Sequence, residues 1–351
     1  MNPTSMRPTF MSPTFMHTEA MASAQQVAVQ LAADQDRYAA LGAALRAHPP
    51  HGTVTIARGS SDHAAGYMAY LIMARSGHLV TSLPMSLLTL YQAPLAMDQM
   101  LAISISQSGR SPDLVEPMQV LHNAGATTVA LVNDASSPLA QAVGWTLPLH
   151  AGPEHSVAAT KSFICSLVAG ARLAAHWGNH YEFIARLHAL PDALHEACQQ
   201  DWSAAIEPLK NAHKLMVIGR GPGLAIANEA ALKFKETCAI QAEAFSGAEV
   251  KHGPMALVID AYPMLVFAPR GPTQNSLVAL AQEMRGRGAH VLLAAPANVP
   301  SRDLTLATAP HEDLDPITAI QSFYLLVEAV ARARGQDPDR PRHLSKVTST
   351  R

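Results

Sequence analysis

Two carboxylates and an amine recur at helical spacing in the second half of the chain. At about 100° per residue, the side chains of Glu229, Lys233 and Glu236 would fall within roughly 60° of one another on a helix. Titratable groups gathered on one face suit acid–base chemistry, although a solvated face with two ion pairs has the same spacing. A second polar motif, Lys251-His252-Gly-Pro254, follows this run.

Two serine-rich turns in the first half suit a phosphate dianion. An apolar stretch ending at Ile105 runs into a polar turn and then into a helix that begins at Pro112. Free backbone N–H groups and the positive end of the helix dipole would face an anion there. An ordinary polar turn is the alternative. The turn supplies Ser106, Gln107, Ser108 and Ser111, and an earlier turn supplies Ser60 and Ser61.

An internal duplication places the serine turns and the ionisable helix in different halves. Residues 51–59 match 213–221, and 101–105 match 263–267, both at an offset of 162 residues. In the second copy Ala268-Pro-Arg replaces the serine turn, so no second phosphate site is expected there. One half would bind phosphate while the other carries titratable groups. This division of roles indicates an enzyme.

Short apolar segments alternate with longer amphipathic ones in both copies. This order predicts an α/β fold with two tandem, doubly wound parallel-sheet domains, covering residues 21–190 and 191–339. A closing helix is expected from Asp315-Pro316 to Gly335, and a tail over 340–351. The strands expected are Val54–Ala57, Met100–Ile105, Thr128–Val132, Leu215–Ile218, Met264–Phe267 and Val291–Ala294.

Composition argues against several other classes of protein. The chain has 25 basic and 27 acidic residues, and this balance argues against a nucleic-acid binder. Three cysteines, whose spacing matches neither a disulfide framework nor a metal site, fit a reducing cytoplasm. No run of about 18 apolar residues occurs, so we expect no membrane span. P-loop, dinucleotide and HExxH motifs are all missing, so we expect no metal or cofactor. Residues 1–20, where Pro-Thr-Phe-Met occurs twice, are expected to form a disordered extension.

Six ordered motifs together resemble a known family. Both halves resemble SIS (sugar isomerase) domains, which implies a flavodoxin-like fold. The chain from about Glu19 to Thr348 is similar to the isomerase portion of glutamine–fructose-6-phosphate aminotransferase. The motifs are Arg58-Gly-Ser-Ser61, Ile105-Ser-Gln-Ser-Gly109, Ala151-Gly-Pro-Glu154 with Val157-Ala-Ala-Thr-Lys161, Glu229–Glu236, Lys251-His-Gly-Pro254 and Arg342-His-Leu-Ser-Lys346.

The resemblance implies a role for each matching position. Glu236 would move a proton between C1 and C2 of an open sugar, with Lys233 and Glu229 beside it. His252, contributed across a homodimer interface, would assist ring opening. Lys346, on the tail that closes the active site, would reach the carbonyl end of the sugar. The sugar phosphate would be held by Ser60, Ser61, Ser106, Gln107, Ser108 and Ser111, with the backbone of Val157 and Ala158 near the sugar.

The departures from the family pattern favour one reaction over another. We expect no glutaminase domain ahead of the SIS domains, and Arg110 and Ala159 stand where the synthase has an acidic residue and Ser. The chain looks more like a stand-alone type II glucosamine-6-phosphate deaminase, an isomerase/deaminase without glutaminase activity. One alternative is a deglycase that acts on amino acid adducts of sugar phosphates. The other alternative is a sugar-phosphate sensor, which would need the serine turns but not Glu236. Such sensors usually carry a DNA-binding domain, and we expect the N-terminal extension to be too short to hold one.

Overall fold

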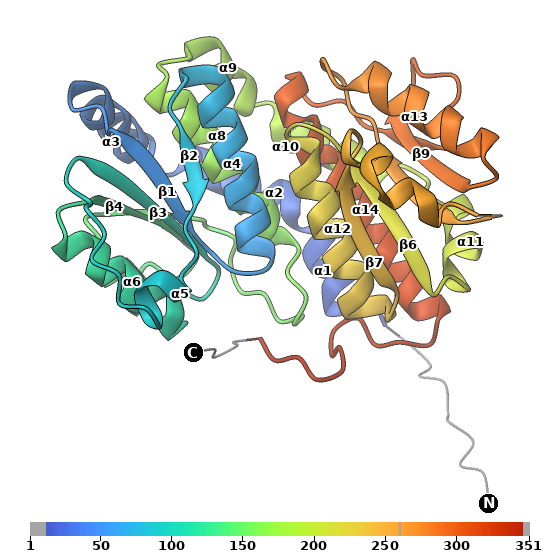
Figure 1. The fold of residues 1–351 in the computed structure, drawn as a ribbon, viewed down its shortest axis with the longest axis horizontal. Coiled ribbons are helices and arrows are strands. Elements are labelled where there is room, and N and C mark those ends of the chain that lie inside the picture. Colours follow the sequence, from blue (N-terminus) through green and yellow to red (C-terminus); the bar gives the residue numbers. More distant parts are fainter. Residues whose placement is uncertain (1–11, 260, 347–351) are drawn as a thin grey trace, which may run out of the picture.

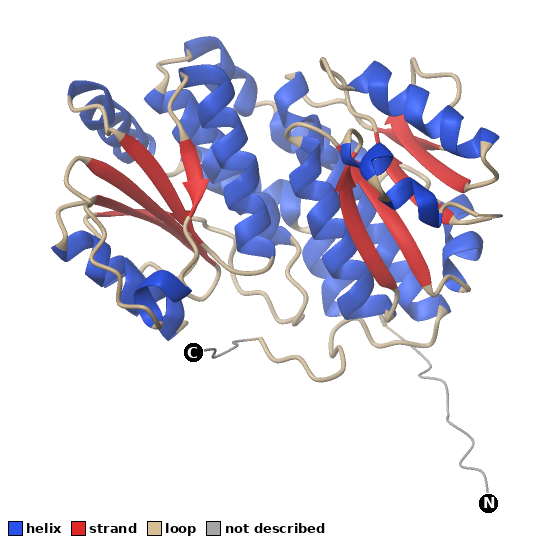
Figure 2. Cartoon of the chain, viewed as in Figure 1, coloured by secondary structure: helices blue, strands red, loops and turns tan. Residues whose placement is uncertain are grey.

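The computed structural model describes residues 12–259 and 261–346, which form two five-stranded parallel sheets with helices on both faces (Figures 1 and 2). The strand order is β2-β1-β3-β4-β5 in the first sheet and β10-β9-β8-β6-β7 in the second. Counted within each half, both orders are 2-1-3-4-5, as in flavodoxin-like folds. The predicted fold class is confirmed. The strands are β1 Gly52–Ile56, β2 Val80–Ser82, β3 Met100–Ser106, β4 Thr127–Val132, β5 Trp145–Pro148, β6 Lys214–Gly219, β7 Gln241–Ser246, β8 Pro263–Phe267, β9 His290–Pro296 and β10 Leu304–Leu306.

The six predicted strands are the three inner strands of each sheet, β1, β3 and β4 in the first and β6, β8 and β9 in the second. Leu101, Ile103 and Ile105 of β3 are fully buried, because helices cover both faces of the sheet. The duplication is visible in the register as well. β1 pairs with β3 in the first sheet, and β6 pairs with β8 in the second. The four strands that the sequence did not predict, β2, β5, β7 and β10, all lie at sheet edges.

The two halves share one apolar core. The long helix α14 lies between them and packs against α12 of the second half and α8 of the first. Its side chains Phe323 and Tyr324 are fully buried, as is Phe234 of α12. The predicted closing helix is therefore confirmed, and it ties the two sheets together. The helices are α1 Phe15–Met21, α2 Ser23–Ala32, α3 Gln35–Ala47, α4 Ser60–Ser76, α5 Ser86–Thr89, α6 Pro112–Asn123, α7 Pro138–Gln141, α8 Lys161–Trp177, α9 Tyr181–Leu187, α10 Leu190–Cys198, α11 Ile206–Lys210, α12 Gly223–Cys238, α13 Gln274–Gly286 and α14 Asp315–Ala333.

The predicted disordered extension over residues 1–20 is wrong for its second half. Helix α1 begins at Phe15, with Thr14 as its N-cap, and packs against α14. Met16 and Ala20 are fully buried, and the Thr14 hydroxyl donates a hydrogen bond to Glu328 of α14 at 2.9 Å. A seven-residue helix is not stable by itself, so α1 forms because α14 covers its apolar face. Residues 1–11 lie outside the described part of the chain.

One helix in the described residues is long and apolar enough to cross a membrane. It spans Glu312–Ala333 and contains α14. Within its most apolar window, 89% of the residues are buried inside the protein. A core helix of a two-sheet protein meets the same criteria of length and hydropathy, and the packing of α14 between the sheets accounts for its composition.

Candidate active site

A cavity of about 500 Å³ opens at the carboxyl ends of β1 and β3, where the winding of the first sheet reverses. The two predicted serine turns meet here, one at the start of α4 and the other just before α6. Five of the six predicted phosphate ligands line the cavity, together with Lys346 from the C-terminal segment. The five are Ser61, Ser106, Gln107, Ser108 and Ser111.

The turn after β3 is held in shape by its own side chains. The Ser106 hydroxyl accepts a hydrogen bond from the Gly109 N–H at 3.0 Å, and the Ser108 hydroxyl accepts one from the Arg110 N–H at 3.3 Å. Gly109 has φ +62°, and a Cβ there would lie 2.1 Å from the Ser137 hydroxyl oxygen. Only glycine fits this position. The turn therefore presents a preformed anion-binding surface at the N-terminus of α6.

Arg58, which lines the cavity, and Arg110, in the turn after β3, are each paired with a carboxylate. Arg58 contacts Asp113 with 3.0 Å between Nε and Oδ2, and Arg110 contacts Asp134 at 2.8 Å. Asp113 lines the cavity and is 5% exposed. An unpaired carboxylate there would repel an anionic ligand, so the Arg58 guanidinium makes the cavity compatible with a phosphate.

Glu229 of α12 is fully buried and joins the two domains. It accepts hydrogen bonds from the Ser60 hydroxyl at 3.0 Å and from the Tyr324 hydroxyl at 3.1 Å, and it contacts the ring of His63 at 3.0 Å. Burial alone would raise the pKa of Glu229, but the Lys233 ammonium and the His63 ring outweigh burial and hold the pKa below its usual range. The Ser60 hydroxyl is thus directed to the second domain, and Ser60 does not line the cavity.

Lys233 and Glu236 confirm the expected helical face, but the face is not solvated. Lys233 is 1% exposed, lies 3.4 Å from Glu229 and donates a hydrogen bond to Glu236. Burial lowers the pKa of Lys233, and the two carboxylates outweigh it and raise the pKa, so the amine is an ammonium. Glu236 is the more accessible carboxylate, with 19% of its side chain exposed. The arrangement leaves one carboxylate free to contact a ligand while the ammonium orients it.

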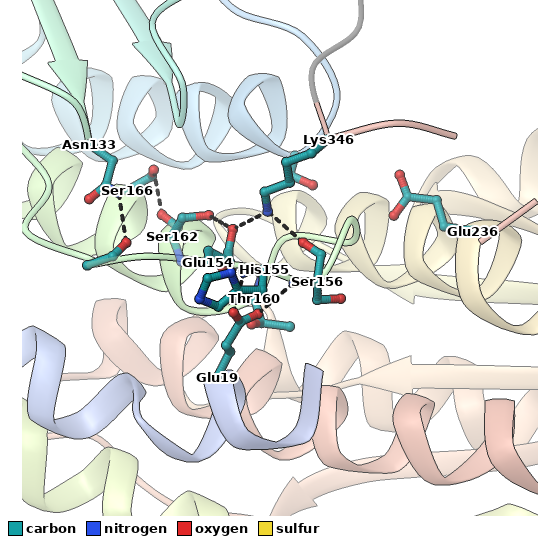
Figure 3. Close-up of polar contacts among 12 residues, drawn as sticks. Glu19, Asn133, Glu154, His155, Ser156, Thr160, Ser162, Ser166, Glu236 and Lys346 are labelled. Carbon is teal, nitrogen blue, oxygen red and sulfur yellow. Dashed lines mark hydrogen bonds and ion pairs between the residues drawn. The ribbon is translucent and has the colours of Figure 1, made fainter. Parts of the chain in front are cut away.

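Lys346 lies over the loop that connects β5 to α8. Its ammonium donates to Glu154 at 2.9 Å and to the Ser156 carbonyl at 2.7 Å. Figure 3 shows Glu236 on the side of Lys346 opposite Glu154, with its carboxylate turned toward the lysine. The C-terminal segment thus brings a cation between the cavity and the α12 carboxylate.

Glu154 anchors that lysine from a fully buried position. It accepts hydrogen bonds from the N–H groups of Thr160 and Ser162, both at 3.1 Å, and so satisfies free donors at the start of α8. Burial alone would raise the pKa of Glu154, but the charge and hydrogen bond of Lys346 outweigh it and lower the pKa. Glu154 is therefore an anion at neutral pH and can hold the ammonium.

Three other predicted residues, Val157, Ala158 and His252, do not line the cavity. The Val157 N–H donates to the Asp339 carbonyl at 3.3 Å, and Ala158 is buried in the same loop. His252 is exposed at the end of the 3₁₀ turn Glu249–His252. The structure describes one chain, so the contribution of His252 across a dimer interface stays a prediction.

Several polar residues of the site had no predicted role. Glu154 stood within a quoted motif, but its partner Lys346 is 192 positions away. His63 and Tyr324, which contact Glu229, and Glu19, which contacts the loop of Glu154, gave no local signal. Within residues 12–259 and 261–346, no three His, Cys, Asp or Glu side chains are arranged to hold a metal ion.

The fold and the site define an α/β protein with a serine-lined cavity on one domain and a buried carboxylate–ammonium cluster on the other. The SIS domain profile matches residues 50–175 and 208–332, one match on each sheet, and the chain belongs to the SIS domain family. The predicted resemblance is confirmed, because the similar proteins include the glutamine–fructose-6-phosphate aminotransferases of Zymomonas mobilis and Thermus thermophilus. They are 33% and 32% identical over 84% and 87% of this chain.

The chain spans about half the length of these relatives, 51% and 53% respectively. Among solved structures, a candidate phosphosugar isomerase of Silicibacter pomeroyi superposes with a TM-score of 0.88 at 40% identity, covering 93% of this chain and all of that one. Glucosamine-6-phosphate deaminase of Thermotoga maritima superposes with a TM-score of 0.77 at 20% identity, covering 96% of this chain and all of that one. At 20% identity the second match shows the shared fold alone.

Proposed function

We propose that the protein is an amino-sugar 6-phosphate isomerase/deaminase, which converts glucosamine 6-phosphate and water to fructose 6-phosphate and ammonia. The observation that carries the proposal is the position of Lys346. Its side chain borders the serine cavity of the first domain, and Glu236 of the second domain is turned toward it (Figure 3). The names of the similar proteins, glutamine–fructose-6-phosphate aminotransferases and a candidate phosphosugar isomerase, support a sugar-phosphate isomerase.

The serine turns, His252, Glu236 and Lys346 each have a role in the proposed reaction. The serine turns hold the phosphate dianion, and His252 helps to open the sugar ring. Glu236 removes the proton from C2 of the open aldose, giving an enolamine whose C1 oxygen is stabilised by the Lys346 ammonium. The same carboxyl group returns the proton to C1, and a proton of the amino group passes to the C1 oxygen, giving an imine at C2 and a hydroxyl at C1. Water adds to that imine, and ammonia leaves with formation of the C2 ketone. The C1 carbonyl accepts the electron pair when the C2 proton leaves, and the imine nitrogen accepts it when water adds to C2.

The first test is turnover of glucosamine 6-phosphate by the purified chain. We expect equal amounts of ammonia and fructose 6-phosphate, and no turnover of unphosphorylated glucosamine, because the phosphate supplies the binding energy that fixes the sugar. Release of an amino acid from a fructosamine 6-phosphate, with no ammonia from glucosamine 6-phosphate, would show a deglycase. Binding of either sugar phosphate without turnover would indicate a sensor.

We also propose that the active form is a homodimer in which each His252 serves the partner's site. Glu236→Gln and His252→Ala are each expected to lower activity. Mixed after subunit exchange, they should recover about a quarter of the wild-type activity, because a two-fold dimer of unlike variants keeps one intact site. Recovery is measured against each variant mixed with itself. A mixture no more active than its components would show that both residues act within one chain.

A further inference from the structure

Helix α1 contacts the loop that holds Lys346. The Glu19 side chain accepts hydrogen bonds from the backbone N–H groups of His155 and Ser156, the latter at 3.2 Å (Figure 3). Glu19 is 5% exposed, so these bonds form in a largely water-free environment, where they are stronger than at the surface. The two N–H groups are adjacent in the chain, and one carboxylate therefore fixes the direction of the peptide between them.

That peptide lies between the two groups that hold the lysine. Glu154 precedes it and accepts from Lys346 through its side chain, and Ser156 accepts from Lys346 through its carbonyl. The Ser156 carbonyl belongs to the next peptide, so a shift of Ser156 after loss of its contact with Glu19 would move that carbonyl away from the ammonium. Ser156 thus joins the two contacts, because its N–H donates to Glu19 and its carbonyl accepts from Lys346.

The same helix also holds the segment that leads to Lys346. Asp339 accepts from the N–H groups of Phe15 and Met16, both at 2.7 Å, at the N-terminus of α1. The Asp339 carbonyl in turn accepts from the Val157 N–H at 3.3 Å. Loop, helix and C-terminal segment therefore form one hydrogen-bonded unit around Lys346.

We propose that Glu19 is a positioning residue, which fixes the 154–156 loop so that the Lys346 ammonium stands at the carbonyl end of a bound sugar phosphate. The proposal rests on the function proposed above. Burial raises the pKa of Glu19, and the negative charge of nearby Glu154 adds to this effect. A second carboxylate beside Glu154 is electrostatically unfavourable, which is understandable if its hydrogen bonds to the loop are what the site requires.

A purely structural role is the alternative, in which Glu19 only keeps α1 on the protein. Thr14→Ala separates the two roles, because Thr14 bonds α1 to Glu328 of α14 and makes no hydrogen bond to the loop. Glu19→Gln keeps the size of the side chain but presents an amide NH₂ to one of the two N–H donors. Both variants loosen α1, and only Glu19→Gln disturbs the peptide beneath Lys346.

The kinetic test compares kcat and KM for glucosamine 6-phosphate in the two variants. We expect Glu19→Gln to lower kcat about tenfold with KM nearly unchanged, because the serine turns that bind phosphate do not contact α1. Thr14→Ala should keep kcat within about twofold at a similar loss of thermal stability. Equal kcat losses in the two variants, or a Glu19→Gln effect confined to KM, would overturn the proposal.

A second test needs no catalytic activity, and so separates failure of this proposal from failure of the proposed function. Trypsin cleaves after Lys346 only when that side chain leaves Glu154. We expect cleavage at this bond, followed by mass spectrometry, to be several-fold faster in Glu19→Gln than in wild type or Thr14→Ala. Unchanged cleavage in Glu19→Gln would show that Glu19 does not hold the lysine's site, whatever the substrate.

Discussion

Glu236→Gln is expected to lower kcat for glucosamine 6-phosphate by about 10²–10⁴-fold, the usual contribution of a well-placed general base. The amide keeps the volume of the carboxylate and can still accept the hydrogen bond from Lys233, so the helix face stays intact. KM should change little, because the phosphate is held by the first domain, and Glu236 acts only when the C2 proton moves.

The measurement is steady-state ammonia release, with solvent deuterium incorporation at C1 of the product as a second readout. Glu196→Gln, an exposed glutamate of α10, is the matched control and should behave as wild type. A Glu236→Gln variant that retains near-normal turnover would remove this residue from the proton transfer. The neighbouring carboxylate Glu229 could not easily replace it, because Glu229 is fully buried.

The central strands could be predicted from sequence because they are buried on both faces and therefore consist of continuous apolar runs. The edge strands could not. β2 has only three residues, and two of them, Thr81 and Ser82, are exposed. β7, from Gln241 to Ser246, has Phe245 as its one large apolar residue and so lacks the continuous apolar run of a buried strand. These segments become strands because a neighbouring strand offers hydrogen bonds, and that information lies elsewhere in the chain.

The same distinction applies to the site. The serine turns and the Glu229–Glu236 face are local patterns, since a turn or a helix alone brings their members together. Glu154 and Lys346 are 192 positions apart and meet only in the tertiary fold, and Glu19 reaches its loop across 137 positions. Helix α1 was mistaken for a disordered segment for this reason. Its apolar residues are few, and their partner α14 lies at the other end of the sequence.

The two copies differ in their polar residues, and the structure brings polar residues of both copies together at Glu229. The first domain contributes Ser60 and His63 to this carboxylate, and the second contributes Lys233 and Tyr324. The hydrogen bonds of one buried side chain thus hold the start of α4, which borders the serine cavity, against the helix that carries Glu236. Any change in this contact should affect stability and the alignment of the two half-sites together.

Glu229→Gln is therefore expected to lower the free energy of unfolding by about 3 kcal/mol, the lower end of the range for breaking a buried ion pair, since Lys233 keeps Glu236 as a partner. The amide would accept fewer hydrogen bonds than the carboxylate and would direct an NH₂ group at surrounding donors. Urea unfolding at neutral pH measures the loss. Glu182→Gln is the control, because its ion pair with Arg186 is exposed, and it should change stability by less than about 1 kcal/mol.

The pH dependence of this difference identifies the charge as its cause. The pKa of Glu229 is lower in the folded protein than in the unfolded chain, so its contribution is present above the unfolded-state pKa and is lost as the pH falls through the folded-state pKa. The stability gap between wild type and Glu229→Gln should thus narrow in acid, while the gap to Glu182→Gln stays small throughout. A gap independent of pH would assign the loss to packing around α12, and the carboxylate would then not be what joins the two domains.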